Sequence, residues 1–326
     1  MQYSLRTPVA LFIYNRPQLT QKIFKEIARA RPSKLLVIAD GPRSGDDLVR
    51  CEAARKIINR VDWNCEVLKN FSPVNLGCKR RMSSGLDWIF ARCDEAIILE
   101  DDTFPHPTFF RFCSELLEKY KNDERVMMIG GSNFQFGRKV NPYNYYFSHY
   151  ALIWGWATWR RAWSYFDLEM KSWPALRNTS WLFNILGDRA SEEYWHNIFD
   201  SVYAGHIDTW DYQWVFACLV QRGLDILPNV NLVSNIGFGQ EATHTRDANN
   251  LSANLPVTAM AFPIQHPDQV VRDKKADQFT FEKVYKPKPL SFYNYLRRKC
   301  SLILPSVIKQ PLSILFSKRA KIKKVV

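Results

Sequence analysis

Short apolar runs and amphipathic stretches alternate along the first 131 residues of the chain. The apolar runs have the composition of strands and cover residues 8–14, 34–39, 65–70, 95–99 and 126–131. Apolar positions at helical spacing mark the stretches between them, residues 17–30, 46–60, 78–92 and 107–120. Strands that alternate with helices of about 10–15 residues are typical of a mainly parallel sheet covered on both faces. The pattern therefore predicts an α/β, Rossmann-like fold with a mainly parallel sheet flanked by helices.

Polar residues directly follow three of the predicted strands. Asn15 and Arg16 come after the first strand, Asp40 after the second, and the acids at 100–102 after the fourth. In parallel sheets, ligands bind beyond the carboxyl ends of the strands. We therefore expect these side chains to meet at one edge of the sheet and to form a ligand site.

The second half of the chain is less regular and rich in aromatic residues. Its features are an aromatic segment at 141–181, a helix at 208–223 that stops at Gly223, and short strands at 225–227 and 231–237. We expect one domain over residues 1–282, composed of the halves 1–131 and 132–282. A basic, amphipathic tail, residues 283–326, follows it.

Nearly all of the net positive charge lies in this tail. The formal net charge is +13, and residues 283–326 hold nine Lys, three Arg and no acidic residue. A neutral body with a basic tail is unlike a uniformly basic nucleic-acid binder. Cations interleaved with apolar side chains suit an anionic membrane surface. We expect the tail to bind such a surface and no nucleic acid; nucleic-acid binding and a plain disordered tail are the alternatives.

The cysteines and the N-terminus bear on the cellular compartment. Seven scattered cysteines form no C-x-x-C pair, which favours a reducing compartment over a disulfide framework. The first apolar run lacks a small-residue cleavage site and is interpreted as a strand. No apolar stretch reaches the roughly 18 residues of a membrane-spanning helix. The expected location is cytoplasmic, peripheral at the inner face of the plasma membrane.

Three consecutive acids, Glu100, Asp101 and Asp102, follow the apolar residues 96–99. On a strand, Glu100 and Asp102 would share one face and Asp101 the other, whereas at a strand end all three can splay around a bound group. Carboxylates bind hard cations such as Mn²⁺ or Mg²⁺, commonly together with substrate phosphates. The position at a strand end favours a metal site, and solvated loop charges are the alternative.

Three cations, Lys79, Arg80 and Arg81, open the helix predicted at 78–92. Cations at a helix N-terminus oppose the helix dipole, although the same end binds anions well. This arrangement suggests an anionic ligand such as a diphosphate; a solvated basic turn is the alternative.

The segment AIILEDD (96–102) resembles the acidic D-x-D-type motif of GT-A glycosyltransferases, in the form found in bacterial family 2-like and N-acetylglucosaminyltransferase I-like enzymes. Further segments resemble that family in the same order: PVALFIYNRP (8–17), VIADGPR (37–43), WGWATWRRAW (154–163), TWDYQW (209–214) and LVSNIGFGQEATHT (232–245). The resemblance covers residues 8–246. It implies a GT-A fold with a nucleotide-binding half, 1–131, and an acceptor-side half, 132–282.

The resemblance also implies roles for single residues. The nucleotide and its sugar would be bound by Tyr14, Asn15, Arg16, Asp40, Lys79, Arg80, Glu100 and Asp101. Asp40 would accept hydrogen bonds from the base, and Arg16 would touch the base or a phosphate. Asp102 would be the direct metal ligand. For Asp40, which precedes Gly41 and Pro42, a simple turn is the alternative.

The catalytic base implied by the resemblance is Asp211. A carboxylate there would take the proton from the acceptor hydroxyl as the new bond forms. The alternative is that Asp211 caps a helix, although Asp208 is the better candidate for that role.

Further candidates lie near the closing loop and the aromatic segment. His244 could be a second metal ligand, since histidine suits Mn²⁺, with an ordinary polar surface role as the alternative. The expected acceptor-lining and sugar-lining residues are Trp154, Gly155, Trp156 and Trp210; for the Trp residues at 154–163 a place in the hydrophobic core is the alternative.

These features together predict a metal-dependent inverting glycosyltransferase with Mn²⁺ or Mg²⁺ as cofactor. The donor would be a nucleotide-sugar, with a UDP-sugar favoured, and the acceptor a glycan or lipid-linked glycan of bacterial envelope polysaccharide or lipopolysaccharide. One alternative is a sugar-nucleotide nucleotidyltransferase, but the first strand is not followed by the glycine-rich phosphate loop usual there. The other is a non-enzymatic carbohydrate-binding protein.

Overall fold

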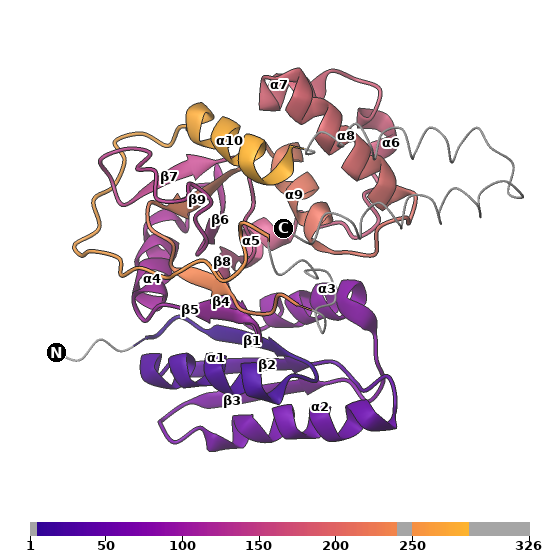
Figure 1. Cartoon of the computed structure of the whole chain (residues 1–326), viewed down its shortest axis with the longest axis vertical. Coiled ribbons are helices and arrows are strands. Elements are labelled where there is room, and N and C mark those ends of the chain that lie inside the picture. The colour runs from indigo at the N-terminus through magenta and orange to yellow at the C-terminus, as the bar shows by residue number, and fades with distance from the viewer. Residues whose placement is uncertain (1–4, 240–249, 287–326) are drawn as a thin grey trace, which may run out of the picture. The chain divides into compact units, whose positions relative to one another are not determined.

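The computed structural model describes residues 5–239 and 250–286 (Figure 1). The chain divides into one compact unit that ends at Tyr285 and a second unit, Lys286–Val326. The sequence prediction placed this boundary after residue 282. Most of the predicted basic tail, residues 287–326, lies outside the described residues.

One mixed sheet of eight strands forms the centre of the described unit, in the order β3-β2-β1-β4-β8-β6-β9-β7. Its strands are β1 (Val9–Ile13), β2 (Lys34–Ala39), β3 (Glu66–Phe71), β4 (Glu95–Glu100), β6 (Val126–Gly130), β7 (Tyr145–Ser148), β8 (Trp156–Trp159) and β9 (Leu224–Pro228). The pairs β3-β2, β2-β1, β1-β4 and β6-β9 are parallel, and those of β8 and β7 with their neighbours are antiparallel. The predicted α/β class with a mainly parallel sheet is confirmed.

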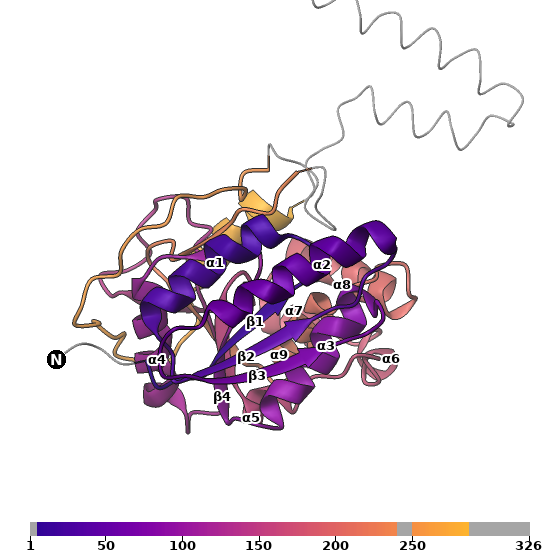
Figure 2. The same ribbon diagram turned by 90° about the horizontal axis from the view of Figure 1, so that it is seen from below.

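Helices cover both faces of this sheet (Figure 2). The longer helices are α1 (Pro17–Ala30), α2 (Gly45–Ile57), α3 (Gly77–Phe90), α4 (Thr108–Tyr120), α8 (Arg189–Tyr203) and α9 (Asp211–Val220). The shorter ones are α5 (Arg160–Trp163), α6 (Trp173–Leu176), α7 (Trp181–Leu186) and α10 (Lys274–Thr280). Val9 and Leu11 of β1 pack on the side of α1, α2 and α4, whereas Ala10 and Phe12 pack on the side of α3, α8 and α9. Because both faces are covered, the central strands are continuous apolar runs.

A small two-stranded sheet lies beside the end of β4. It pairs β5 (Thr103–Pro105) antiparallel with β10 (Val233–Asn235). Chain segments that are far apart in the sequence therefore meet next to the acidic residues. None of the described helices is long and apolar enough to cross a membrane.

The predicted helix bounds differ from the structure most clearly at α9. The prediction was 208–223 with Gly223 as its stop, but the helix ends at Val220 and Arg222 takes the left-handed conformation, with φ 52°. Gly223 instead allows close packing, since a Cβ atom there would lie 2.1 Å from Cγ of Met127. The role predicted for Gly223 was therefore wrong.

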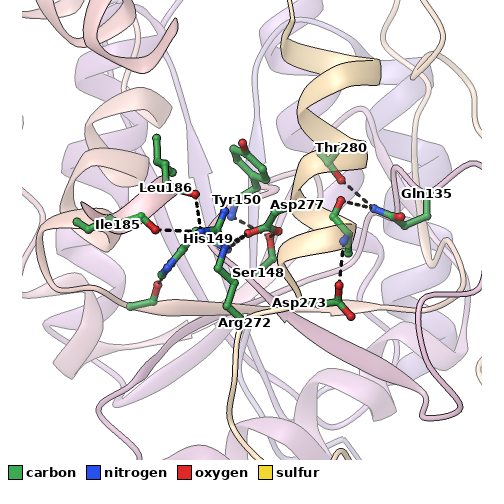
Figure 3. Close-up of polar contacts among 12 residues, drawn as sticks. Gln135, Ser148, His149, Tyr150, Ile185, Leu186, Arg272, Asp273, Asp277 and Thr280 are labelled. Atoms are coloured by element: carbon green, nitrogen blue, oxygen red, sulfur yellow. Dashed lines mark hydrogen bonds and ion pairs between the residues drawn. The ribbon is translucent and has the colours of Figure 1, made fainter. Parts of the chain in front are cut away.

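A buried polar network fastens α10 to the edge strand β7 (Figure 3). The Asp277 carboxylate accepts hydrogen bonds from Ser148 Oγ (2.5 Å), His149 N (3.0 Å) and Arg272 Nε (2.6 Å). Arg272 also donates to the carbonyls of Ile185 and Leu186, both at 2.9 Å. The charge of Asp277 is thus balanced inside the protein, and the segment after residue 271 is held on the sheet.

Candidate active site

A cavity of about 290 Å³ lies beyond the carboxyl ends of the central strands. Its walls come from the ends of β1, β2 and β4, the start of α3, the loop before β8, the start of α9, and β10. The volume is near the lower end of the range of roughly 300–1,000 Å³ for small-molecule sites. The strand ends that the sequence analysis singled out therefore meet at one edge, as predicted.

The three acids reach this cavity through a turn rather than along a strand. Glu100 ends β4, and Asp101 and Asp102 form the turn into β5. Thr103 Oγ1 accepts a hydrogen bond from Glu100 N (2.8 Å) and donates to Glu100 O (3.0 Å), which closes the turn. All three carboxylates line the cavity. The three acids are therefore spread around the cavity, as expected for a strand end, and do not alternate between two faces, because the chain leaves the strand conformation after Glu100.

One guanidinium partly balances the three carboxylates. Arg16 Nη1 lies 3.0 Å from Asp102 Oδ2 and 3.9 Å from Asp101 Oδ1. Asp101 Oδ2 also accepts a hydrogen bond from Tyr14 N at 3.1 Å. Arg16 thus touches the acids, where the sequence analysis expected it to touch a base or a phosphate.

Burial raises the pKa of every member of the trio, and repulsion between the acids raises it further for Glu100 and Asp101. Burial, and then the charge of Asp102, raise the pKa of Asp101 to about 7. The pKa of Glu100 lies well above its usual range, because of burial and the charges of Asp102, Asp101 and Asp211. Burial also raises the pKa of Asp102, although Arg16 opposes this. A further positive charge would stabilise the ionised trio.

The residues present fit a cation that arrives together with a phosphate ligand. Among the described residues, no group of three or more His, Cys, Asp or Glu side chains is arranged to hold a metal ion. Mg²⁺ and related hard cations, however, are commonly bound by one or two carboxylates plus substrate phosphates. Asp102 and Asp101 could supply the two carboxylate ligands of such a cation. His244, the other predicted ligand, lies outside the described residues.

Asp211, the first residue of α9, also lines this cavity. Its carboxylate accepts hydrogen bonds from Thr209 Oγ1 and from Tyr212 N (2.9 Å). The N-cap residue is Trp210, and no side chain caps α9, so Asp208 does not have the capping role considered for it. Asp211 is held in place by its neighbours with its charge close enough to raise the pKa of Glu100.

Asp40 organises the site from within the protein. Oδ1 accepts from Gly41 N (2.9 Å) and Leu76 N (2.9 Å), and Oδ2 accepts from Asn75 Nδ2 (3.1 Å) and Gly77 N (3.1 Å). These bonds satisfy the amides at the start of α3, which a helix leaves without partners. Since protein donors occupy both oxygens, a nucleotide base would have to displace one of them to bind Asp40 as predicted.

The residues after β1 are fixed by Asp47 of α2. Tyr14 Oη donates to Asp47 Oδ2 at 2.6 Å, and Asn15 Nδ2 donates to Asp47 Oδ1 at 2.7 Å. Tyr14 lines the cavity and Asn15 does not. The guanidinium of Arg43 lies 5.7 Å from the centre of the Tyr14 ring. Tyr14 and Asn15 were both predicted to bind the nucleotide. Of this pair, the structure brings Tyr14 to the cavity.

The cations at the start of α3 divide by helical phase. Cys78, Arg81 and Met82 line the cavity, whereas Lys79 and Arg80 do not. Residues three and four apart share a helix face, so a face that starts at Cys78 continues to Arg81 and excludes the two residues between them. Arg81 Nη2 also donates to Asn70 Oδ1 at 3.0 Å. The prediction that Lys79 and Arg80 bind the ligand is therefore wrong, and Arg81 is the cation of this group that lines the cavity.

The predicted aromatic residues also divide into two groups. Trp154 and Trp210 line the cavity, but Trp156 is fully buried, with its ring 5.9 Å from Trp210 and 5.7 Å from Trp214. The prediction that Trp156 lines the site is therefore wrong, because β8 directs it into the core behind Trp210. Position 155 requires a glycine for two reasons. Its φ of 62° is left-handed, and a Cβ atom on residue 155 would lie 2.7 Å from Cγ2 of Val233.

Several cavity residues were not found from the sequence. They are Arg43, Asn75, Cys78, Thr209 and Asn235. Thr209 is two residues before Asp211, and Asn235 reaches the site through the pairing of β10 with β5. A search for polar residues beside each predicted strand end would have found Arg43, and a search around Asp211 would have found Thr209. The others depend on tertiary contacts.

No protein-family model matches the sequence, and no curated protein matches it. Solved structures similar to this one include UDP-glucose pyrophosphorylase complexed with UDP-glucose, at 11% identity and a TM-score of 0.34, covering 68% of this chain and 90% of that chain. Apo-UDP-glucose pyrophosphorylase matches at 10% identity and a TM-score of 0.37, covering 70% of this chain and 93% of that chain. Similarity at this level carries no argument about the activity of this chain.

Proposed function

We propose that this protein is a glycosyltransferase that binds a nucleotide-sugar in the cavity and transfers the sugar to an acceptor hydroxyl. The observation that carries the proposal is the position of four carboxylates, Glu100, Asp101, Asp102 and Asp211, on the walls of one cavity at the carboxyl edge of the sheet. Three of them belong to one turn, and the fourth stands apart on α9. Two separate acidic groups suit two separate tasks, charge compensation and proton transfer.

Each part of the cavity would have its own task in the reaction. Tyr14 and Arg43 lie near the end of β2 and would contact the nucleoside, and Arg81 would face its phosphates. In the transfer, the acceptor oxygen forms a bond to the anomeric carbon, and its proton moves to Asp211. The bond from that carbon to the diphosphate oxygen breaks, and the electron pair leaves with the diphosphate. A divalent cation held by Asp102 would offset the charge on that leaving group.

Nucleotidyl transfer is the second candidate, because carboxylates that could hold a cation beside phosphates, in a cavity at the carboxyl edge of the sheet, also suit that reaction. It would join a nucleoside triphosphate to a sugar phosphate and release pyrophosphate. The sequence after β1, YNRPQ, contains no glycine for a phosphate loop, which favours glycosyl transfer. Asp211 also has a task in glycosyl transfer, since a hydroxyl must lose its proton, whereas a sugar phosphate is already ionised.

The test measures nucleotide binding and turnover in two variants. Asp102→Asn should weaken the Mn²⁺-dependent binding of UDP by at least about tenfold in calorimetry, because one cation ligand is lost. Asp211→Asn should keep that affinity and lower the release of UDP from a panel of UDP-sugars by roughly 10²-fold or more. Asp94→Asn is the control, since its side chain is 89% exposed at the start of β4.

Two outcomes would contradict the proposal. Unchanged UDP affinity in Asp102→Asn would remove the metal assignment. Release of pyrophosphate from UTP and a sugar 1-phosphate, without release of UDP from any UDP-sugar, would replace glycosyl transfer by nucleotidyl transfer.

A further inference from the structure

A row of four aromatic rings leads away from the cavity. Trp154 lines the cavity, and its ring lies 5.6 Å from Phe238 and 5.3 Å from Phe134. Phe134 in turn stacks on Phe136, at 6.4 Å between ring centres and 15° between ring planes. We call these four residues the aromatic row. They come from the loop after β6, the loop before β8 and the segment after β10, so three separate parts of the chain contribute to it.

The outer end of the row is both exposed and strained. The Phe136 side chain is 37% exposed. Arg138 N donates to Gln135 O at 3.0 Å, which closes a turn whose central residues, Phe136 and Gly137, have φ values of 49° and 86°. Two central residues at positive φ are typical of a type I′ turn, where Asn and Gly are preferred.

A phenylalanine at this position is unfavourable for stability in two ways. The left-handed conformation is costly for a residue with a bulky side chain, and a ring that stays 37% exposed forgoes part of the free energy of burial. Strain of this kind is concentrated at binding and catalytic sites. The position of Phe136 therefore indicates a contact with a ligand.

From these contacts we infer that the aromatic row is the binding track of an oligosaccharide acceptor, whose sugar rings stack on Trp154 and, further out, on Phe136. The inference rests on the proposed function, and it specifies the acceptor as a chain of sugars rather than a single sugar. Phe136 does not line the cavity, so a ligand that touches it must extend beyond the sugar that reacts. Flat aromatic faces suit the C–H faces of sugar rings, while the ring hydroxyls remain hydrated.

A lipid chain is a less suitable occupant of the row. Aliphatic chains are bound by larger apolar surfaces, and the exposed aliphatic side chains of the first half of the chain, Leu48, Val49, Val74 and Leu76, lie on α2 and in the loop before α3, outside the aromatic row. Among the described residues, the large exposed apolar side chain of the loop between β6 and β7 is Phe136. One exposed ring that stacks on a buried one offers a single face for stacking and not a lipid groove.

The test compares Phe136→Asn with the full-length wild-type chain. The probe is an array of α- and β-linked oligosaccharides of one to six glucose, galactose, mannose or N-acetylglucosamine units, read in the presence of UDP and Mn²⁺. In at least one series, longer oligomers should bind the wild type more tightly than the monosaccharide does. Phe136→Asn should weaken this binding by about twofold to tenfold. The same substitution should raise the melting temperature, because Asn tolerates the left-handed turn.

The matched control is Tyr203→Ala, which removes another exposed aromatic ring, 47% exposed at the end of α8. It should leave the dependence of binding on oligosaccharide length unchanged. The inference is overturned if no oligosaccharide binds better than its monosaccharide, or if Phe136→Asn binds like the wild type. It is also overturned if Phe136 is needed instead for binding to sugar-free phosphatidylglycerol vesicles. UDP binding in the same samples reports separately on the proposed function.

Discussion

Asp225 of β9 carries a carboxylate that is buried without compensation. Its side chain is fully buried, and neither oxygen has a hydrogen-bond partner among the described residues. Burial, and then the charge of Asp277, raise its pKa well above the usual range. An uncompensated buried charge is costly, so the folded protein favours the neutral form of the Asp225 side chain.

This predicts how stability depends on pH. Because the pKa of Asp225 is higher in the folded than in the unfolded state, the folded state binds more protons, and stability falls as pH rises. Asp225→Asn removes this loss. Unfolding in urea at pH 5 and pH 8 measures this effect. The unfolding free energy of Asp225→Asn minus that of the wild type should be larger at pH 8 than at pH 5, by up to about 1.4 kcal/mol per pH unit.

The control for this prediction is Asp123→Asn. A hydrogen bond from Arg125 lowers the pKa of Asp123, so its contribution is present above the unfolded-state pKa and is lost only at lower pH. Its substitution should cost the same small amount of stability at both pH values. A difference for Asp225→Asn that stays flat between pH 5 and pH 8 would show that Asp225 does not titrate as its burial requires.

At the scale of elements, β10 fixes the acidic turn. Ile236 N donates to Asp102 O at 2.8 Å, and a Cβ atom at Gly237 would lie 2.2 Å from Asp102 Oδ2. The backbone of Gly237 thus packs directly against the Asp102 carboxylate. Any larger residue at position 237 would push that carboxylate away from the place where it pairs with Arg16.

Gly237→Ala should therefore move Asp102 without touching the ligand directly. We expect the Mn²⁺-dependent affinity for UDP to fall by roughly tenfold, with a stability loss of about 1–3 kcal/mol from overpacking. Calorimetry and thermal unfolding measure the two effects. Gly45→Ala is the matched control, because its Cβ atom would meet nothing within 4 Å. Unchanged affinity in Gly237→Ala would mean that Asp102 is free to move aside without consequence.

The elements of the first half were predictable because their patterns are local. Helix α1 and strand β2 have the predicted bounds, Pro17–Ala30 and Lys34–Ala39. Strands β7 and β8 were missed because they are fully buried and consist largely of aromatic residues. Such strands show no alternation of polar and apolar positions.

The part of the site formed by residues that directly follow a strand could be predicted from the sequence. Tyr14, Arg16, Asp40 and the acids at 100–102 meet in the cavity because parallel strands end at one edge. The direction of single side chains was less accessible. Trp156 and Lys79 were misassigned because strand facing and helix phase decide their direction. The partners of Asp40 could not be found, because they belong to a loop that follows another strand.

At the scale of the whole molecule, Tyr285 marks where the described unit ends. Its ring lies 5.1 Å from that of Tyr150, 5.3 Å from Trp195 and 5.8 Å from Tyr194. The remaining residues, 286–326, carry most of the net charge of the chain. Packing therefore requires the chain as far as Tyr285, and the basic tail begins directly after it.

This division allows the membrane prediction to be tested without damage to the fold. A chain that ends at residue 286 should unfold at the same temperature as the full chain but lose binding to vesicles of phosphatidylglycerol and phosphatidylcholine in co-sedimentation. The expected loss is large, since each basic residue near an anionic surface contributes about 1 kcal/mol. A chain that ends at residue 282 is the contrasting variant, because without Tyr285 it should be less stable. If the chain that ends at residue 286 still sediments with the vesicles, the membrane contact belongs to the folded unit and not to the tail.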